Sequence, residues 1–208
     1  MKLLTLVRHG ETEWHAENRY AGRSDIALTE KGLFQAEQLA QWARTAGLHA
    51  IWSSSLSRAL RTAEPAARAT GLAVQIDSRL VELDFGDAEG MTGREMATAF
   101  PQAREAFLQD PATNFLPSGE DPAEAADRGM AALRHIAEKL PDGARALVVG
   151  HNTLFRLLLC KSLGLPLSSY RKVFPKLANT TVTELGFASD HIALLAFNSP
   201  LLFETKRG

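Results

Sequence analysis

Two histidines and two arginines follow short apolar runs that are typical of buried strands. His9 comes directly after one such run with Arg8 beside it, and His151 comes directly after another. Arg58 lies a few residues after a third run. An imidazole can act as a nucleophile, and the planar donors of arginine match the oxygens of a tetrahedral dianion. These residue types together predict a pocket that binds a compact anion such as phosphate.

The elements that must position these side chains alternate between strand and helix patterns. Strands are predicted at residues 3–7, 49–54, 73–76 and 144–151, with a hairpin at 179–187 and 191–197 that turns at Ser189-Asp190. Helices are predicted at residues 29–47, 57–71, 123–140 and 153–164. This alternation indicates an α/β fold, a three-layer α/β/α sandwich with a mostly parallel central sheet. In such sheets ligands bind beyond the carboxyl ends of the strands, which is where the two histidines stand.

Local signals refine these elements. Thr29 is the predicted N-cap of the first helix, which is expected to stop at Gly47. Its apolar stripe, expected to face the core, is Leu33, Ala36, Leu39, Ala40 and Ala43. Pro65 is expected to kink or split the second helix.

Residues 80–125 are less regular and are interpreted as a small insertion over the active site. Short helices are expected there at 93–100 and 104–110, separated by Pro101. Such a loop-rich segment commonly carries specificity, so it is the expected wall of the substrate pocket.

Composition limits the classes of function. The chain has 208 residues, which suits one domain over 1–208, and its net charge of −1 gives no general attraction to nucleic acid or to an anionic membrane. No apolar run is long enough for a membrane helix, and the single Cys160 rules out an intrachain disulfide. We therefore expect a cytoplasmic protein with neither nucleic-acid nor membrane partners. The last residues, 204–208, are expected to fray, and no pattern indicates an oligomeric state.

Four segments resemble the motifs of one family and occur in the family's order. They are LVRHGETEW, SSSLSRALRTA, LVELDFGDAEG and LVVGHNTLFRLLL, and together they span most of the chain. The resemblance is to the histidine phosphatase superfamily, which has the phosphoglycerate-mutase-like fold. One such motif would be weak evidence, but four in order make coincidence improbable.

The resemblance implies five catalytic residues. His9 would be the nucleophile that takes the phosphoryl group as phosphohistidine. Arg8, Arg58 and His151 would bind the phosphoryl oxygens and stabilise the charge that develops during transfer. Glu82 would protonate the leaving oxygen and then help to activate water.

Neighbouring residues compete for two of these roles. Asp84 and Glu89 compete with Glu82 as the acid, and Arg61 lies one helical turn beyond Arg58. The motif alignment selects Glu82 and Arg58, and Arg61 is expected to form a surface ion pair.

The predicted substrate-binding residues are Gly10, His15, Gly22, Phe85 and Asn152. Two of them depart from the family pattern, because His15 stands where the family commonly has Asn and Asn152 where it commonly has Gly. His15 is expected at the pocket edge as an N–H donor that could gain charge at low pH. Asn152 or the following Thr153 is expected to cap the next helix. We expect no cofactor and no metal, since no HExxH motif or cysteine cluster is present.

A third departure bears on the reaction. The bisphosphoglycerate-dependent mutases of the family carry a Lys where this chain has Gly93, and a pair of adjacent arginines in a longer insertion. Here the arginines between residues 90 and 130 are the isolated Arg94, Arg104 and Arg128. We therefore favour a phosphatase acting on a small phosphorylated metabolite. The alternatives are a bisphosphoglycerate-dependent phosphoglycerate mutase and a phosphate-binding protein that has lost catalysis.

Overall fold

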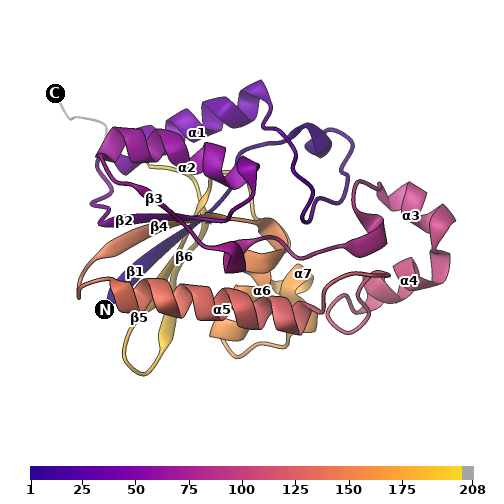
Figure 1. Cartoon of the computed structure of the whole chain (residues 1–208). Helices are drawn as coiled ribbons and strands as arrows, with labels where there is room; N and C mark the ends of the chain where they lie inside the picture. Colours follow the sequence, from indigo (N-terminus) through magenta and orange to yellow (C-terminus); the bar gives the residue numbers. More distant parts are fainter. Residues whose placement is uncertain (203–208) are drawn as a thin grey trace.

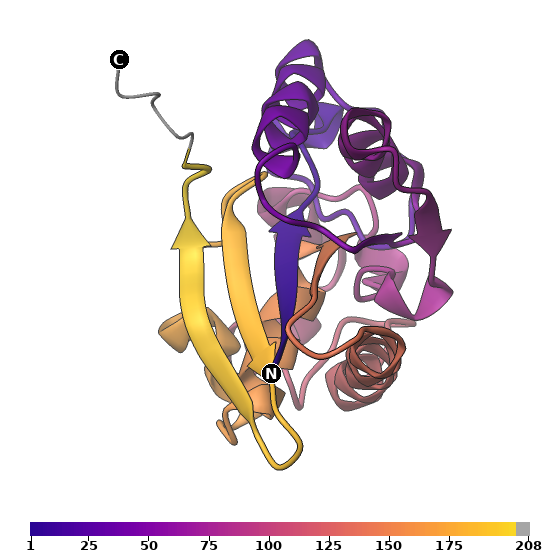
Figure 2. The ribbon, with the colours of Figure 1, turned by 90° about the vertical axis from the view of Figure 1, so that its left-hand side faces the viewer.

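A six-stranded mixed sheet forms the centre of the protein in the computed structural model, which describes residues 1–202 (Figure 1). The strand order is β3-β2-β4-β1-β5-β6. The parallel strands are β1 (Lys2–Arg8), β2 (Ala50–Ser53), β3 (Val74–Ile76) and β4 (Arg145–Gly150). The antiparallel strands at one edge are β5 (Val182–Phe187) and β6 (Ile192–Ser199), which form the predicted hairpin (Figure 2). The predicted α/β fold with a mostly parallel sheet is confirmed.

Helices cover both faces of the sheet, as the sandwich prediction requires (Figure 1). One face carries α1 (Glu30–Ala43) and α2 (Ser57–Thr70), and the other carries α5 (Pro122–Lys139) and α6 (Asn152–Ser162). Alternate residues of β4 serve the two cores, since Leu147 packs toward the first pair of helices and Val148 toward the second. Burial on both faces explains why these strands are continuous apolar runs rather than alternating ones.

The first helix begins where it was predicted and buries four of the five residues of its predicted apolar stripe, Ala36, Leu39, Ala40 and Ala43. The Thr29 hydroxyl accepts a hydrogen bond from the Gly32 N–H at 3.0 Å, which confirms the N-cap. Leu33 is 45% exposed, so the prediction that it is buried was wrong. Gly32 faces inward instead, because a Cβ there would lie 2.1 Å from the Glu11 carbonyl oxygen and only glycine permits this approach. The helix also ends at Ala43, before the predicted stop at Gly47.

The second helix continues through Pro65, so the prediction of a split was wrong. A proline in a helix removes one hydrogen bond and costs stability. The cost is offset here because Ala59, Ala63 and Ala66 are fully buried and pack the helix onto the sheet.

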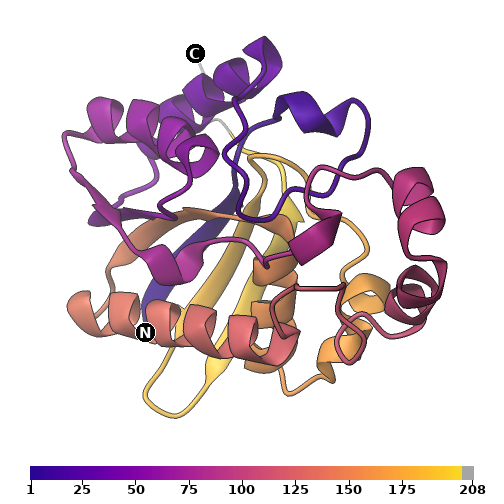
Figure 3. The same ribbon diagram turned by 45° about the vertical axis from the view of Figure 1, so that its right-hand side comes forward.

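The segment at 80–125 contains two short helices, α3 (Gly93–Ala99) and α4 (Pro101–Gln109), which lie beyond one end of the sheet (Figure 3). Pro101 is the first residue of α4, a position that needs no backbone N–H. The remaining helix is α7 (Tyr170–Val173), after α6. No helix within residues 1–202 is long and apolar enough to cross a bilayer. The predicted frayed tail at 204–208 lies outside the described residues.

Candidate active site

A cavity of about 320 Å³ lies at the carboxyl ends of the parallel strands. The predicted site residues that line it are Arg8, His9, His15, Glu82, Phe85 and Asn152. Arg58 and His151 lie behind this lining and are fully buried. The centroids of the His9 and His151 rings are 5.2 Å apart, so the ends of β1 and β4 bring the two histidines together.

His9 is held with one nitrogen occupied and the other free. Its Nδ1 lies 2.7 Å from the Gly10 carbonyl oxygen, which can only accept, so Nδ1 carries the proton and the Nε2 lone pair is available. The ring is 5% exposed. Burial, followed by the charges of Arg58 and Arg8, holds the pKa of His9 well below its ordinary value. The ring is therefore neutral and oriented as a nucleophile requires.

The two predicted arginines are anchored through their terminal nitrogens. Arg8 donates from Nη1 to the Leu177 carbonyl at 2.9 Å, and Arg58 donates from Nη2 to the Gly22 carbonyl at 2.6 Å. Burial is the main reason that the pKa of Arg8 is lowered to about 10, and it lowers the pKa of Arg58 as well. Both guanidinium groups remain charged at neutral pH.

Hydrogen-bond donors near His9 are left without partners. Within residues 1–202 the buried Nε atoms of Arg8 and Arg58 and the Nδ1 atom of His151 have none. The Ser54 hydroxyl lies 2.8 Å from Nε2 of His151, and when this hydroxyl donates to Nε2, the proton of the neutral His151 ring is on Nδ1. Buried donors are rarely left unpaired, so this cluster indicates a ligand rich in acceptor oxygens.

Glu82 caps the helix that follows the second histidine. Its two carboxylate oxygens accept from the backbone N–H groups of Thr153 at 2.8 Å and Leu154 at 2.7 Å. The prediction that Asn152 or Thr153 caps this helix was wrong, because the acceptor comes from a carboxylate about 70 positions earlier in the chain. Glu82 is 4% exposed and lines the cavity, so its carboxyl group is placed at the site by the helix it caps.

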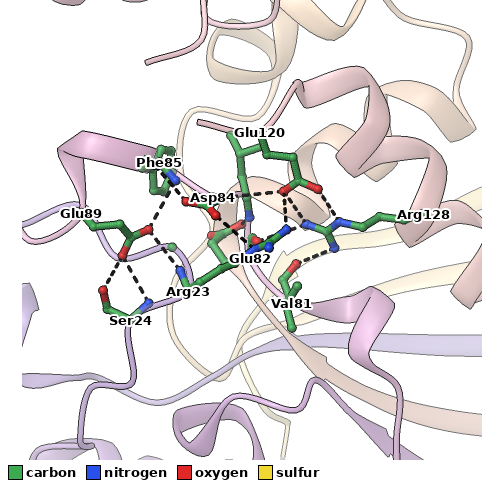
Figure 4. A network of polar contacts seen from close by, with 12 residues as sticks. Arg23, Ser24, Val81, Glu82, Asp84, Phe85, Glu89, Glu120 and Arg128 are labelled. Carbon is green, nitrogen blue, oxygen red and sulfur yellow. Dashed lines mark hydrogen bonds and ion pairs between the residues drawn. The ribbon is translucent and has the colours of Figure 1, made fainter. Parts of the chain in front are cut away.

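A polar network holds the Glu82 segment in place (Figure 4). Arg128 donates to the carbonyl oxygens of Val81 at 2.8 Å and Glu82 at 3.1 Å, and it forms an ion pair with Glu120 at 2.7 Å. The Glu120 carboxylate also accepts from the Asp84 N–H at 3.2 Å. Arg128 is thus occupied with the backbone of this segment, and it does not line the cavity.

The rival acids are committed elsewhere in this network. Glu89 accepts from the backbone and hydroxyl of Ser24 at 3.2 and 2.6 Å, and Asp84 accepts from the Gly86 N–H at 2.9 Å. Neither carboxylate lines the cavity. Arg61 is exposed, whereas Arg58 is buried. Glu82 thus lines the cavity and Arg58 is buried behind its lining, while their catalytic roles stay predictions.

His15 lies between the cavity and Thr12. Its Nδ1 is 3.0 Å from the Thr12 N–H nitrogen, and its Nε2 is 2.7 Å from Nη2 of Arg8. Burial and then the charge of Arg8 lower its pKa to about 4. The His15 ring is therefore neutral at neutral pH and gains a proton only near pH 4.

The two predicted glycines contribute backbone rather than cavity surface. Gly10 orients His9 through its carbonyl, and Gly22 holds Arg58 in the same way. A Cβ at Gly10 would lie 2.6 Å from the Gly32 carbonyl oxygen, so the close approach that requires glycine is to α1. A role for either glycine in substrate binding stays a prediction.

Several site residues escaped sequence reasoning. Arg156, Arg171 and Tyr20 line the cavity, and Asn179 donates to the His9 carbonyl at 2.7 Å. The sequence could have pointed to Arg156. An arginine inside the apolar run of residues 154–160 is expected to be buried, and a buried charge needs a partner or a ligand. The short polar segment around Arg171 offers no such signal.

Comparison with known proteins agrees with this geometry. Residues 4–200 match the family model described as the histidine phosphatase superfamily, branch 1. The chain is 39% identical over 182 residues to "Probable phosphoglycerate mutase GpmB" of Citrobacter koseri, covering 88% of this chain and 83% of that one.

Solved structures are similar over nearly the whole chain. Bacillus stearothermophilus YhfR matches with a TM-score of 0.89 and 30% identity, covering 96% of this chain and 98% of that one. Mycobacterial glucosyl-3-phosphoglycerate phosphatase in complex with VO3 matches with a TM-score of 0.85 and 30% identity, covering 96% and 100%. The same mycobacterial enzyme has also been solved with inorganic phosphate.

A buried histidine beside two arginines whose Nε atoms are buried, at the carboxyl edge of a mostly parallel α/β sheet, is an arrangement suited to binding a phosphoryl group. The chain belongs to the histidine phosphatase superfamily, branch 1, and it is a hydrolase of that family. The predicted family and class of enzyme are confirmed.

Proposed function

We propose that the protein hydrolyses small phosphomonoesters through a phosphohistidine intermediate on His9, without a metal ion. The observation that carries this proposal is the set of unpaired buried donors on Arg8, Arg58 and His151 around a histidine whose Nε2 is free. Phosphoryl transfer needs mainly positioning and charge stabilisation, and these groups supply both. The arginines take the place that a metal ion has in many phosphatases.

The first chemical step forms a bond between Nε2 of His9 and phosphorus while the bond from phosphorus to the ester oxygen breaks. Glu82, in its acid form, gives a proton to that oxygen, and the alcohol leaves. Arg8, Arg58 and His151 hold the phosphoryl oxygens as their charge redistributes. In the second step water attacks phosphorus, Glu82 takes a proton from the water, and the bond to His9 breaks. The products are an alcohol and inorganic phosphate.

Hydrolysis is favoured over mutase activity because the insertion brings no arginine to the cavity. Neither Arg94 nor Arg104 lines it, and Arg128 is bound to backbone carbonyls and Glu120. Isomerisation of 3-phosphoglycerate primed with a trace of 2,3-bisphosphoglycerate tests this choice. Isomerisation faster than phosphate release would identify a mutase.

Turnover of p-nitrophenyl phosphate in EDTA tests the proposed function. Activity should persist in EDTA and fall by roughly 10⁴-fold or more in His9→Ala, since removing a nucleophile removes the covalent route. The exposed His191→Ala is the matched control and should keep full activity. A phosphoenzyme trapped by rapid quenching should appear in the parent protein and be absent from His9→Ala. Activity that survives His9→Ala would refute the nucleophile, and no turnover at all in the parent protein would favour a binding protein.

A further inference from the structure

Two arginines that the proposed chemistry does not use line the same cavity. Arg156 on α6 is 8% exposed, and its guanidinium lies 4.9 Å from the centroid of the Tyr170 ring. Arg171 on α7 lies 4.5 Å from the centroid of the Phe107 ring and donates from Nε to the Tyr170 hydroxyl at 2.9 Å. Aromatic packing thus fixes both guanidinium groups at the cavity without neutralising them.

Neither arginine has a carboxylate partner. Among residues 1–202, no Asp or Glu oxygen lies within 4.0 Å of Arg156 or Arg171. Arg19 lines the same cavity and shows the contrast, because it is paired with Glu17 and Glu95. A largely buried cation without a counter-ion is costly, and the charge of the partly buried Arg171 adds to that cost for Arg156, so an anion from outside the chain would be favoured here.

The free hydrogen-bonding capacity of Arg156 agrees with this reading. Its Nε and Nη1 donate to the carbonyl oxygens of Asn152 and Phe174, both at 3.3 Å. Nη2 of Arg156 has no hydrogen-bond partner among the described residues. This atom is not fully buried, and Arg156 lines the cavity. The charge of Arg156 also helps to lower the pKa of Arg8, after burial and against the opposing effect of Glu82, so the two arginines lie near each other.

We propose that Arg156 and Arg171 form a second anion subsite that binds a carboxylate or second phosphate on the leaving group of the substrate. This inference rests on the proposed function, because the first anion is the phosphoryl group at His9. The cavity of about 320 Å³ is at the small end of ligand pockets and fits a metabolite of a few carbon atoms. The preferred substrate class is therefore a small phosphomonoester that carries a second negative charge.

This subsite lies on other segments of the chain than the pair of adjacent arginines that the family's mutases carry in their longer insertion. The insertion arginines Arg94 and Arg104 do not reach the cavity. The positive charge comes instead from α6 and α7. These helices begin at Asn152 or later, far from His9 in the sequence. The insertion contributes the aromatic ring of Phe107, on which Arg171 rests.

A matched set of substrates tests the subsite. 3-Phosphoglycerate and glycerol 3-phosphate differ by a carboxylate against a hydroxymethyl group, glycerol 1,3-bisphosphate supplies a second phosphate, and p-nitrophenyl phosphate supplies neither. The parent protein should show a kcat/KM at least tenfold higher for one or both of the doubly anionic substrates than for glycerol 3-phosphate. The preference between carboxylate and phosphate identifies which anion the subsite takes.

The test variant is Arg171→Met, which keeps much of the aliphatic stem and removes the charge. It should lower kcat/KM for the preferred doubly anionic substrate by about 10- to 100-fold, the value of a charged hydrogen bond, mainly through KM. The loss of kcat/KM for p-nitrophenyl phosphate, which carries no second anion, should be smaller by a factor of about five or more, and an unchanged thermal unfolding midpoint shows that the variant is folded. Arg171→Lys should recover part of the loss, and the exposed Arg94→Met should change nothing.

The outcomes separate the two proposals. If p-nitrophenyl phosphate is hydrolysed through His9 but all substrates are used equally, the second subsite is wrong and the phosphatase stands. Equal losses on every substrate in Arg171→Met would also overturn the subsite, because they would show a structural role. Loss of the His9 dependence would overturn the phosphatase itself.

Discussion

The inner and outer halves of the cavity are held by different kinds of contact. The inner half comprises Arg8, His9, Arg58, Glu82 and His151. Four of these side chains are bound to main-chain groups, those of Leu177, Gly10, Gly22 and Thr153. A side chain tied to the backbone moves only if the fold moves. The inner half is therefore preorganised in the way that charge stabilisation requires.

The outer half comprises Tyr20, Phe85, Arg156 and Arg171. Aromatic packing holds all four, and within the described part of the chain only the side chain of Arg156 among them also binds main-chain groups, at the longer distance of 3.3 Å. The rings of Tyr20 and Phe85 meet at 5.0 Å between centroids, and the two arginines rest on Tyr170 and Phe107. Such contacts tolerate exchange of one side chain better than a hydrogen-bonded backbone does. The difference is the one expected if the inner half carries the proposed chemistry and the outer half selects the substrate.

The largest effect expected from this comparison is that of Arg58→Met. It removes a buried charge from the phosphoryl site and should lower kcat/KM for p-nitrophenyl phosphate by about 10³-fold. The variant should also be less stable by roughly 1–3 kcal/mol, because the Gly22 and Ser24 carbonyls lose their donor. Steady-state rates and thermal unfolding measure the two effects.

The control lies one turn along the same helix. Arg61 is exposed, so Arg61→Met should leave both the rate and the stability unchanged. A loss of less than tenfold in Arg58→Met would show that the inner half does not depend on this charge.

Glu82→Gln is expected to have the next largest effect, and it depends on the leaving group. An alkyl phosphate needs a proton on its leaving oxygen, so kcat for glycerol 3-phosphate should fall about 10²-fold. p-Nitrophenol leaves readily as an anion, so the loss for its ester should be at least ten times smaller. Equal losses on both substrates would show that Glu82 is not the general acid and acts only as the cap of α6. The exposed Glu124→Gln is the control.

The inner half was largely predictable from the sequence, because strand ends are local features. An apolar run that stops at Arg8 and His9 places both side chains at the edge of a sheet, and the same holds for His151. Motif order then identified Arg58 and Glu82. The parallel sheet and its flanking helices followed from alternating patterns in the same way.

The remainder depended on contacts between distant segments, which periodicity does not encode. The cap of α6 comes from Glu82 rather than from Asn152, and the inward face of α1 is set by contact between Gly32 and Glu11. Arg171 reaches the cavity only because α7 packs beside Phe107 of the insertion. No local pattern announces any of these pairings.

The protonation of His15, which lies beside Arg8 of the inner half, gives a further test. Burial and then Arg8 lower its pKa from the ordinary 6.5 to about 4. The unfolded chain therefore binds a proton below pH 6.5 that the folded protein does not bind until about pH 4. The free energy of unfolding should therefore fall as the pH decreases through this window.

Urea unfolding at pH 7 and pH 5, in buffer free of phosphate, measures this dependence. His15→Asn should lose less stability than the parent protein between the two pH values. His191→Asn, at an exposed position in the hairpin, should lose as much as the parent protein. An unchanged pH dependence in His15→Asn would mean that this ring is protonated in the folded state.

Glu89→Gln has the smallest expected effect. It tests the hydrogen bonds that connect the inner half of the cavity to the outer half. Its carboxylate accepts from the N–H groups of Arg23, Ser24 and Phe85 (Figure 4). The Ser24 carbonyl in turn accepts from Arg58 at 2.7 Å. A glutamine would turn an NH₂ group toward some of these donors and loosen the loop that holds Arg58. We expect kcat/KM to fall about tenfold, with inhibition by vanadate weakened in parallel, and no change in the exposed Glu105→Gln.

A double-mutant cycle separates this positioning role from a merely structural one. If Glu89 acts through Arg58, then adding Glu89→Gln to Arg58→Met should cost little further activity, since the group that Glu89 positions is already gone. If the two losses multiply, Glu89 acts independently of Arg58. The insertion would then support the inner half by another route, and the division between a fixed inner half and an exchangeable outer half would have to be redrawn at Glu89.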